Sequence, residues 1–104
     1  MQKLLLISMA FAAIYAGPAW SQGADQNLAR NIAAGCSSCH GTNGISQGGV
    51  PSLAGQSKAD LVRKMQDFKA GRTPATIMHQ LAKGYTDEQI DLVAGWFAAQ
   101  KTAP

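Results

Sequence analysis

The stretch Cys36–Ser37–Ser38–Cys39–His40 constrains this chain more than any other feature of its sequence. The two cysteines are the only ones among 104 residues, and a histidine directly follows the second. In an exported protein this spacing is typical of the attachment site of a c-type haem. Both thiols can reach the vinyl groups on one edge of a porphyrin, while the imidazole faces the iron as the proximal ligand. The motif therefore predicts one covalently bound haem c per chain, held by Cys36, Cys39 and His40.

Three other roles of the cysteine pair fit the sequence less well. A redox-active pair at this spacing is typical of a βαβ unit, and the sequence contains no strand-like run. A zinc site needs two further ligands at suitable spacing, and His79 is the only other histidine. A structural disulfide leaves the position of His40 unexplained. The pattern therefore favours haem attachment over redox exchange, zinc binding and a plain disulfide.

The first 21 residues have the pattern of a secretory signal peptide. Lys3 supplies a basic start, an apolar run extends from Leu4 to Ala16, and small residues precede the expected cleavage site before Gln22. The alternative is a membrane anchor, but a helix that spans a bilayer needs about 20 apolar residues, and polar residues end this run earlier. We therefore expect a cleaved signal peptide at 1–21, a monohaem domain at 22–104 without a membrane anchor, and a periplasmic location.

An electron-carrying haem needs a second axial ligand, and methionine is the choice that raises the reduction potential. Only Met65 and Met78 follow the signal segment. Met65 lies on the apolar face of a predicted helix at 57–70, where a methionine usually packs in the core. Met78 lies in a stretch that begins with turn residues, 38 residues after His40, which is far enough for the chain to reach the other haem face. The sequence favours Met78, with His79 as the alternative because imidazole also binds iron well.

The domain is predicted to be all-α, with about four short helices around the haem. Hydrophobic periodicity and capping residues predict helices at about 25–35, 57–70 and 77–83, and a last one that begins at a capping box over 86–89. The stretch 41–55 contains five glycines and few bulky residues, so no element of its own is expected there. The positions expected to face the core are Leu28, Ile32, Leu61, Val62, Met65, Phe68, Ile90, Val93, Ala94 and Phe97.

Composition and charge exclude other classes of protein. With 46% hydrophobic and 14% charged residues, the chain is too apolar for a disordered protein and too poorly charged for a coiled coil. The nine basic residues give a formal net charge of +3, but they are spread along the chain without the patch that nucleic-acid binding requires. We therefore expect no nucleic-acid partner.

Together these features resemble the class I c-type cytochromes, and the resemblance covers the chain from residue 22 onward. It implies a small all-α fold in which the first and last helices cross at a small residue and an aromatic one, here Ala29 and Trp96. In that family a proline carbonyl accepts a hydrogen bond from Nδ1 of the proximal histidine, and Pro51 matches this position. Such a bond would fix the imidazole ring and strengthen His40 as an iron ligand.

The stretches Phe68–Arg72, Thr76–Met78 and Ala82–Ile90 are similar to the cytochrome subunit of flavocytochrome c sulfide dehydrogenase. This resemblance implies an electron-accepting role beside a flavoprotein subunit that oxidises sulfide. The alternatives are a free monohaem carrier that delivers electrons to a terminal oxidase, and a haem enzyme or ligand sensor in which Met78 is displaced. An iron with ligands on both faces has no open position, which favours electron transfer. A docking face for the redox partner is expected from Lys58, Lys64, Lys69 and Lys83.

Overall fold

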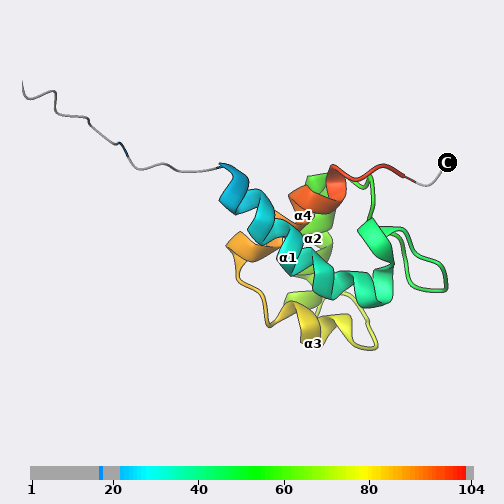
Figure 1. Ribbon diagram of the computed structural model, residues 1–104. Helices are drawn as coiled ribbons and strands as arrows, with labels where there is room; N and C mark the ends of the chain where they lie inside the picture. The colour runs from blue at the N-terminus through cyan, green and yellow to red at the C-terminus, as the bar shows by residue number, and fades with distance from the viewer. Residues whose placement is uncertain (1–16, 18–21, 103–104) are drawn as a thin grey trace, which may run out of the picture.

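The computed structural model describes residue 17 and residues 22–102, which form a bundle of short helices (Figure 1). Within these residues the chain forms four α-helices and one 3-10 turn, and no strand. The elements in chain order are α1 (Gln22–His40), η1 (Thr42–Gly44), α2 (Lys58–Lys69), α3 (Met78–Ala82) and α4 (Asp87–Ala98). The predicted all-α class is confirmed.

The core lies where α1, α2 and α4 meet. α1 packs against α4, and α2 packs against both α4 and the short helix α3. In Figure 1, α1 crosses in front of α2 and α4, and α3 lies at the lower end of the molecule. Alanines on α1 and α4 let the two backbones approach closely, because the ridges between helices are then low. The central cluster consists of Ala33, Leu61, Val93, Ala94 and Phe97.

Two helices begin at the residues that the sequence predicts. The Ser57 hydroxyl accepts a hydrogen bond of 3.1 Å from the backbone N–H of Asp60, in the first turn of α2. Thr86 and Gln89 form a capping box at the start of α4, in which each side chain accepts from the backbone N–H of the other residue, at 3.1 and 2.9 Å. The hydrogen bonds to the Ser57, Thr86 and Gln89 side chains satisfy N–H groups that have no partner inside the helix, so both helix starts are fixed locally. At the other end of α2, Gly71 takes a positive φ of 75°.

α1 differs from the prediction in its length and in its buried side. It continues to His40 instead of ending near residue 35, so the cysteine motif is helical. Leu28 is 47% exposed, whereas Ala29 and Ala33 are buried. The predicted inward position of Leu28 is therefore wrong, while Ile32 is half-buried and packs at the edge of the core. Where α1 and α4 approach most closely, the space between the helices admits alanine side chains, and the larger Leu28 side chain points away from this contact.

Three further observations concern the site, and the first of them differs from the prediction. The glycine-rich stretch contains η1, although no element was expected there. α3 begins at Met78, with Ile77 as its N-cap, so Met78 belongs to the first turn of a helix. Trp96 is half-buried and packs at the edge of the core cluster, and Ala33 of α1 is 1% exposed, against 6% for Ala29.

Ion pairs and hydrogen bonds tie α2 to α4. Lys58 pairs with Asp91 at 3.0 Å, and Lys69 pairs with Asp87 at 3.3 Å. The Gln66 side-chain amide also donates to Asp87 at 2.9 Å, and this bond, together with Lys69, lowers the pKa of the Asp87 carboxyl. Lys58 and Lys69 are therefore already engaged in ion pairs with α4. The docking face of four lysines stays a prediction.

The predicted signal peptide at 1–21 lies outside the described residues apart from Gly17. The cleavage site and the domain start at residue 22 therefore stay predictions. Among the helices of the described part, none has both the length and the hydrophobicity needed to cross a bilayer.

Candidate haem-binding site

The last turns of α1 present the two cysteines and His40. Cys36 and His40 are four residues apart and therefore lie on the same side of the helix. Both cysteines are free thiols; Cys36 is half-buried against the core, and Cys39 is exposed. Burial raises the pKa of the Cys36 thiol. Two free thiols within one turn of a histidine are the groups that thioether attachment of a porphyrin requires.

A backbone carbonyl sets the orientation of His40. Nδ1 of the ring lies 2.6 Å from the carbonyl oxygen of Pro51. A carbonyl oxygen only accepts hydrogen bonds, so Nδ1 carries a proton and donates it, and in the neutral imidazole Nε2 keeps its lone pair. Nε2 is therefore the nitrogen available to a metal, and the bond at Nδ1 makes it a stronger donor. The structure thus brings together His40 and the proline to which the resemblance points.

Hydrogen bonds at the end of the loop hold Pro51 in place. The Gly44 carbonyl accepts from the backbone N–H groups of residues 53 and 54, at 2.8 and 3.1 Å. The carbonyl of Phe97, in the last turn of α4, accepts from the Gly55 N–H at 3.0 Å. The loop that carries Pro51 is therefore fastened to η1 at one point and to the C-terminal helix at another.

Gly44 lets this loop pack directly against α4. It is buried, and its φ of 78° lies in the left-handed region. A Cβ at this position would lie 2.7 Å from a ring carbon of Phe97 and 2.9 Å from the backbone nitrogen of Ala54. The Phe97 ring is itself only 2% exposed, so it has little room to move aside. Glycine is the residue that fits both the space and the backbone conformation.

Replacing Gly44 with alanine is expected to destabilise the folded holoprotein by about 2–4 kcal/mol, from overpacking against Phe97 and from the left-handed backbone. Gly49→Ala is the matched control, because a Cβ there meets nothing within 4 Å. This control should change stability by less than about 0.5 kcal/mol. Guanidinium unfolding of both variants measures the difference. Equal unfolding midpoints would contradict the role of Gly44.

α3 carries both candidates for the second axial ligand. Met78 and His79 are its first two residues, and both are half-buried. Consecutive residues of a helix point about 100° apart, so the two side chains face different directions. Nδ1 of His79 is buried and has no hydrogen-bond partner among the described residues. α3 packs against α2, whereas His40 belongs to α1, so the candidate ligands come from separate elements.

These residues fit a covalently attached haem. The chain offers two thiols, an imidazole with a free Nε2 and a thioether. No group of three or more His, Cys, Asp or Glu side chains gathers among the residues whose side chains the structure describes. The sequence points to Pro51 but gives no indication that Gly44 and Phe97 support it. The five glycines of residues 41–55 indicate that this backbone passes close to another group. They do not indicate Phe97, because this residue lies far along the chain.

Comparison with known proteins shows that the candidate site lies in a stretch that matches one protein family. Residues 26–100, which include every candidate site residue, match the family model described as cytochrome c. The chain is 44% identical over 62 residues to the cytochrome subunit of sulfide dehydrogenase from Chlorobaculum tepidum, a match that covers 60% of this chain and 56% of the relative. It is 34% identical over 98 residues to cytochrome c4 from Pseudomonas aeruginosa, covering 93% and 48%. It is 37% identical over 73 residues to a thiosulfate dehydrogenase electron acceptor from Thiomonas intermedia, covering 66% and 34%. The chain therefore spans about half the length of these relatives, or less.

Proposed function

Since the chain belongs to the cytochrome c family, whose members carry electrons on covalently bound haem c, we propose that it is a periplasmic one-electron carrier with His40 and Met78 as iron ligands. The observation that carries this proposal is the hydrogen bond of 2.6 Å between His40 Nδ1 and the Pro51 carbonyl, because it leaves Nε2 free for iron. The signal-like pattern at 1–21 supports export.

Each residue has a separate role in this proposal. The thiols of Cys36 and Cys39 would hold the cofactor through thioether bonds and so retain it in a small domain. Pro51 orients His40, and His40 and Met78 would hold the iron. A bound haem c supplies the one-electron chemistry. With both iron ligands supplied by the protein, no site would remain for a substrate, and the chain would pass electrons without transforming a molecule itself.

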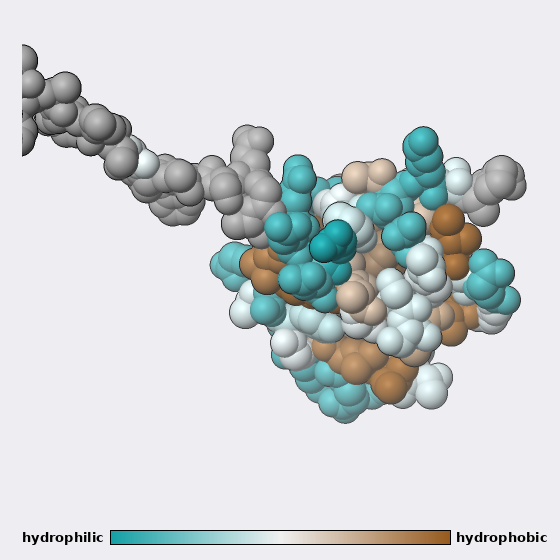
Figure 2. Space-filling view, viewed as in Figure 1, coloured by the Kyte–Doolittle hydropathy of each residue, from teal (hydrophilic) through white to brown (hydrophobic). Residues whose placement is uncertain are grey.

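We propose a sulfide-oxidising flavoprotein as the electron donor. The 44% identity to the cytochrome subunit of a sulfide dehydrogenase supports this partner. A flavin can take two electrons from sulfide and release them singly, which matches a one-electron acceptor. The α3 end of the molecule offers a contact surface, because Ile77 and Leu81 are 56% and 45% exposed there and Lys83 is exposed beside them. Figure 2 shows hydrophobic surface at this lower end, next to polar side chains.

A freely diffusing carrier is the second candidate. The identity to cytochrome c4 over 93% of this chain and to a thiosulfate dehydrogenase electron acceptor supports it. Such a carrier would meet its partners through small, salt-sensitive contacts, whereas a permanent subunit would remain bound at moderate salt.

Purification from the native periplasm distinguishes the two candidates. For the subunit, we expect a complex with a flavin-containing protein that persists at moderate salt, and reduction of the haem by sulfide only when that protein is present. Thiosulfate added to the same complex is the control and should not reduce the haem. Recovery as a lone monomer, with no flavoprotein able to reduce it on addition of sulfide, would favour the free carrier.

A charge variant tests the contact surface at α3. Lys83→Gln should slow reduction by the flavoprotein roughly fivefold at low salt, because charges at the rim of an interface mainly affect the association rate. Lys101→Gln is the matched control, since Lys101 is also exposed but lies beyond α4. Stopped-flow reduction of both variants gives the two rates. Equal slowing by the two substitutions would reject α3 as the contact surface.

A further inference from the structure

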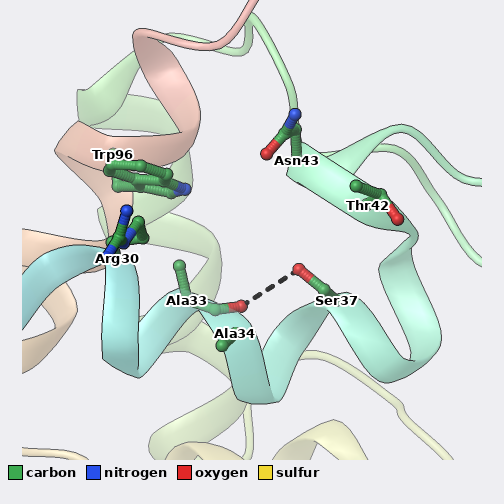
Figure 3. Close-up of a pocket in the computed structure, with 7 residues that line it drawn as sticks. All are labelled: Arg30, Ala33, Ala34, Ser37, Thr42, Asn43 and Trp96. Atoms are coloured by element: carbon green, nitrogen blue, oxygen red, sulfur yellow. Dashed lines mark hydrogen bonds between the residues drawn. The ribbon is translucent and has the colours of Figure 1, made fainter.

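A second concave site lies beside α1, apart from the residues assigned to the haem. It is a pocket of about 210 Å³ between α1, η1 and Trp96 of α4 (Figure 3). None of the cysteines, axial-ligand candidates or Pro51 lines it. Its volume is below the roughly 300–1,000 Å³ of pockets for drug-sized ligands, so it suits a ligand of only a few heavy atoms.

Two of the polar side chains around the pocket, Trp96 and Arg30, can only donate hydrogen bonds. Figure 3 shows the indole nitrogen of Trp96 at the opening and Arg30 beneath the indole ring, with Asn43 on the opposite side and its amide oxygen turned toward Trp96. The Asn43 amide and the Thr42 hydroxyl can both donate and accept. The indole N–H and the guanidinium can therefore converge on one acceptor.

Arg30 also brings a positive charge that is not compensated within the described residues. It is exposed and forms no ion pair there, whereas Arg63 and Arg72 both pair with Asp67. Two donors, one of them charged, favour an anionic ligand, because hydrogen bonds between charged groups are stronger than neutral ones.

The floor of the pocket is apolar. Ala33 and Ala34 form it, and the Trp96 ring adds an aromatic wall. The hydroxyl of Ser37 donates to the Ala33 carbonyl at 3.3 Å, so its proton is already engaged. An apolar floor beneath a rim of donors fits a ligand with a short hydrocarbon part and a negatively charged end.

We propose that this pocket binds a carboxylate carried on a short apolar stem. Two sources have this chemistry: a free short-chain acid, and a glutamate side chain of a protein partner. The stem lies over the alanines, and the carboxylate accepts from Arg30 and Trp96. Besides Trp96, the residues that line the pocket belong to α1, which ends at His40, and to η1, which follows it, so the pocket wall is close in sequence to the haem-attachment motif.

Nuclear magnetic resonance of the reduced holoprotein tests this proposal directly. The reporter is the indole N–H resonance that disappears in Trp96→Phe. Butyrate should shift this resonance saturably, and 1-butanol, with the same stem and no charge, should not. Arg30→Gln should weaken butyrate binding about tenfold, as expected for loss of a charged hydrogen bond. Arg63→Gln, which removes an exposed arginine of α2, should leave binding unchanged.

A blocked glutamate, N-acetylglutamate N-methylamide, identifies the source of the carboxylate. Binding as tight as that of butyrate supports a glutamate side chain of a partner, and binding of butyrate alone supports a free acid. The proposal is overturned if butyrate gives no saturable shift of the Trp96 resonance, or if Arg30→Gln binds butyrate as tightly as the unmodified protein does.

Discussion

Replacing Met78 with alanine is expected to convert the haem iron from low-spin to high-spin and to lower its reduction potential by on the order of 0.1–0.3 V. This shift is a fraction of the roughly 0.8 V range that axial ligands control. The thioether favours the reduced iron, and its loss leaves an open axial position that added carbon monoxide can fill. Absorption spectra and a redox titration measure both effects. The unmodified protein should not bind carbon monoxide, which separates an electron carrier from a ligand sensor.

Two matched variants assign the ligand. Met65→Leu keeps the side-chain volume on α2 and should leave the iron low-spin. His79→Ala removes the neighbouring imidazole of α3 and should also leave it low-spin. A low-spin Met78→Ala variant together with a high-spin His79→Ala variant would make His79 the ligand. A high-spin Met65→Leu variant would move the assignment to α2.

Replacing both Cys36 and Cys39 with serine is expected to abolish folding of the exported chain. Among the described residues only Phe97 and Ile90 are large side chains with less than 2% exposure, so the polypeptide by itself buries little apolar volume. A domain of this size has roughly 3–5 kcal/mol of stability from its own core, and loss of a bound cofactor leaves apolar groups without contacts. Circular dichroism of the purified variant should show little helix and no cooperative melting transition.

Ser38→Ala is the control for the cysteine variant, because it changes the same turn of α1 and keeps both thiols. It should retain covalent haem after denaturation and melt cooperatively. A helical, cooperatively melting protein from the double serine variant would show that packing alone stabilises the fold.

The starts of α2 and α4 could be predicted because the determinants are local. Ser57 and Thr86 accept hydrogen bonds from residues only three positions away, so the sequence pattern contains the whole interaction. The buried side of α1 could not be predicted in the same way. Leu28 has the more apolar side chain, but the contact with α4 decides which residue is buried, and that contact admits Ala29 and Ala33.

The same distinction holds at the site. The cysteine pair and His40 are contiguous and were evident from spacing alone. The Pro51 position followed from a family resemblance, and the bond to His40 spans 11 residues. The contact of Gly44 with Phe97 joins residues from opposite halves of the domain, and no local pattern encodes it. The pocket beside Trp96 draws on three elements and was not expected either.

The bond from Gly55 to the Phe97 carbonyl has a consequence for the order in which the chain can mature. The cysteines and His40 emerge early in synthesis, but the loop that orients His40 is completed only by the last helix. Contacts between distant parts of a chain form late, because closing a long loop costs entropy before the contact compensates for it. Haem attachment can therefore act on a flexible motif that does not yet have its native geometry. Alignment of the imidazole comes afterwards, when the C-terminus docks.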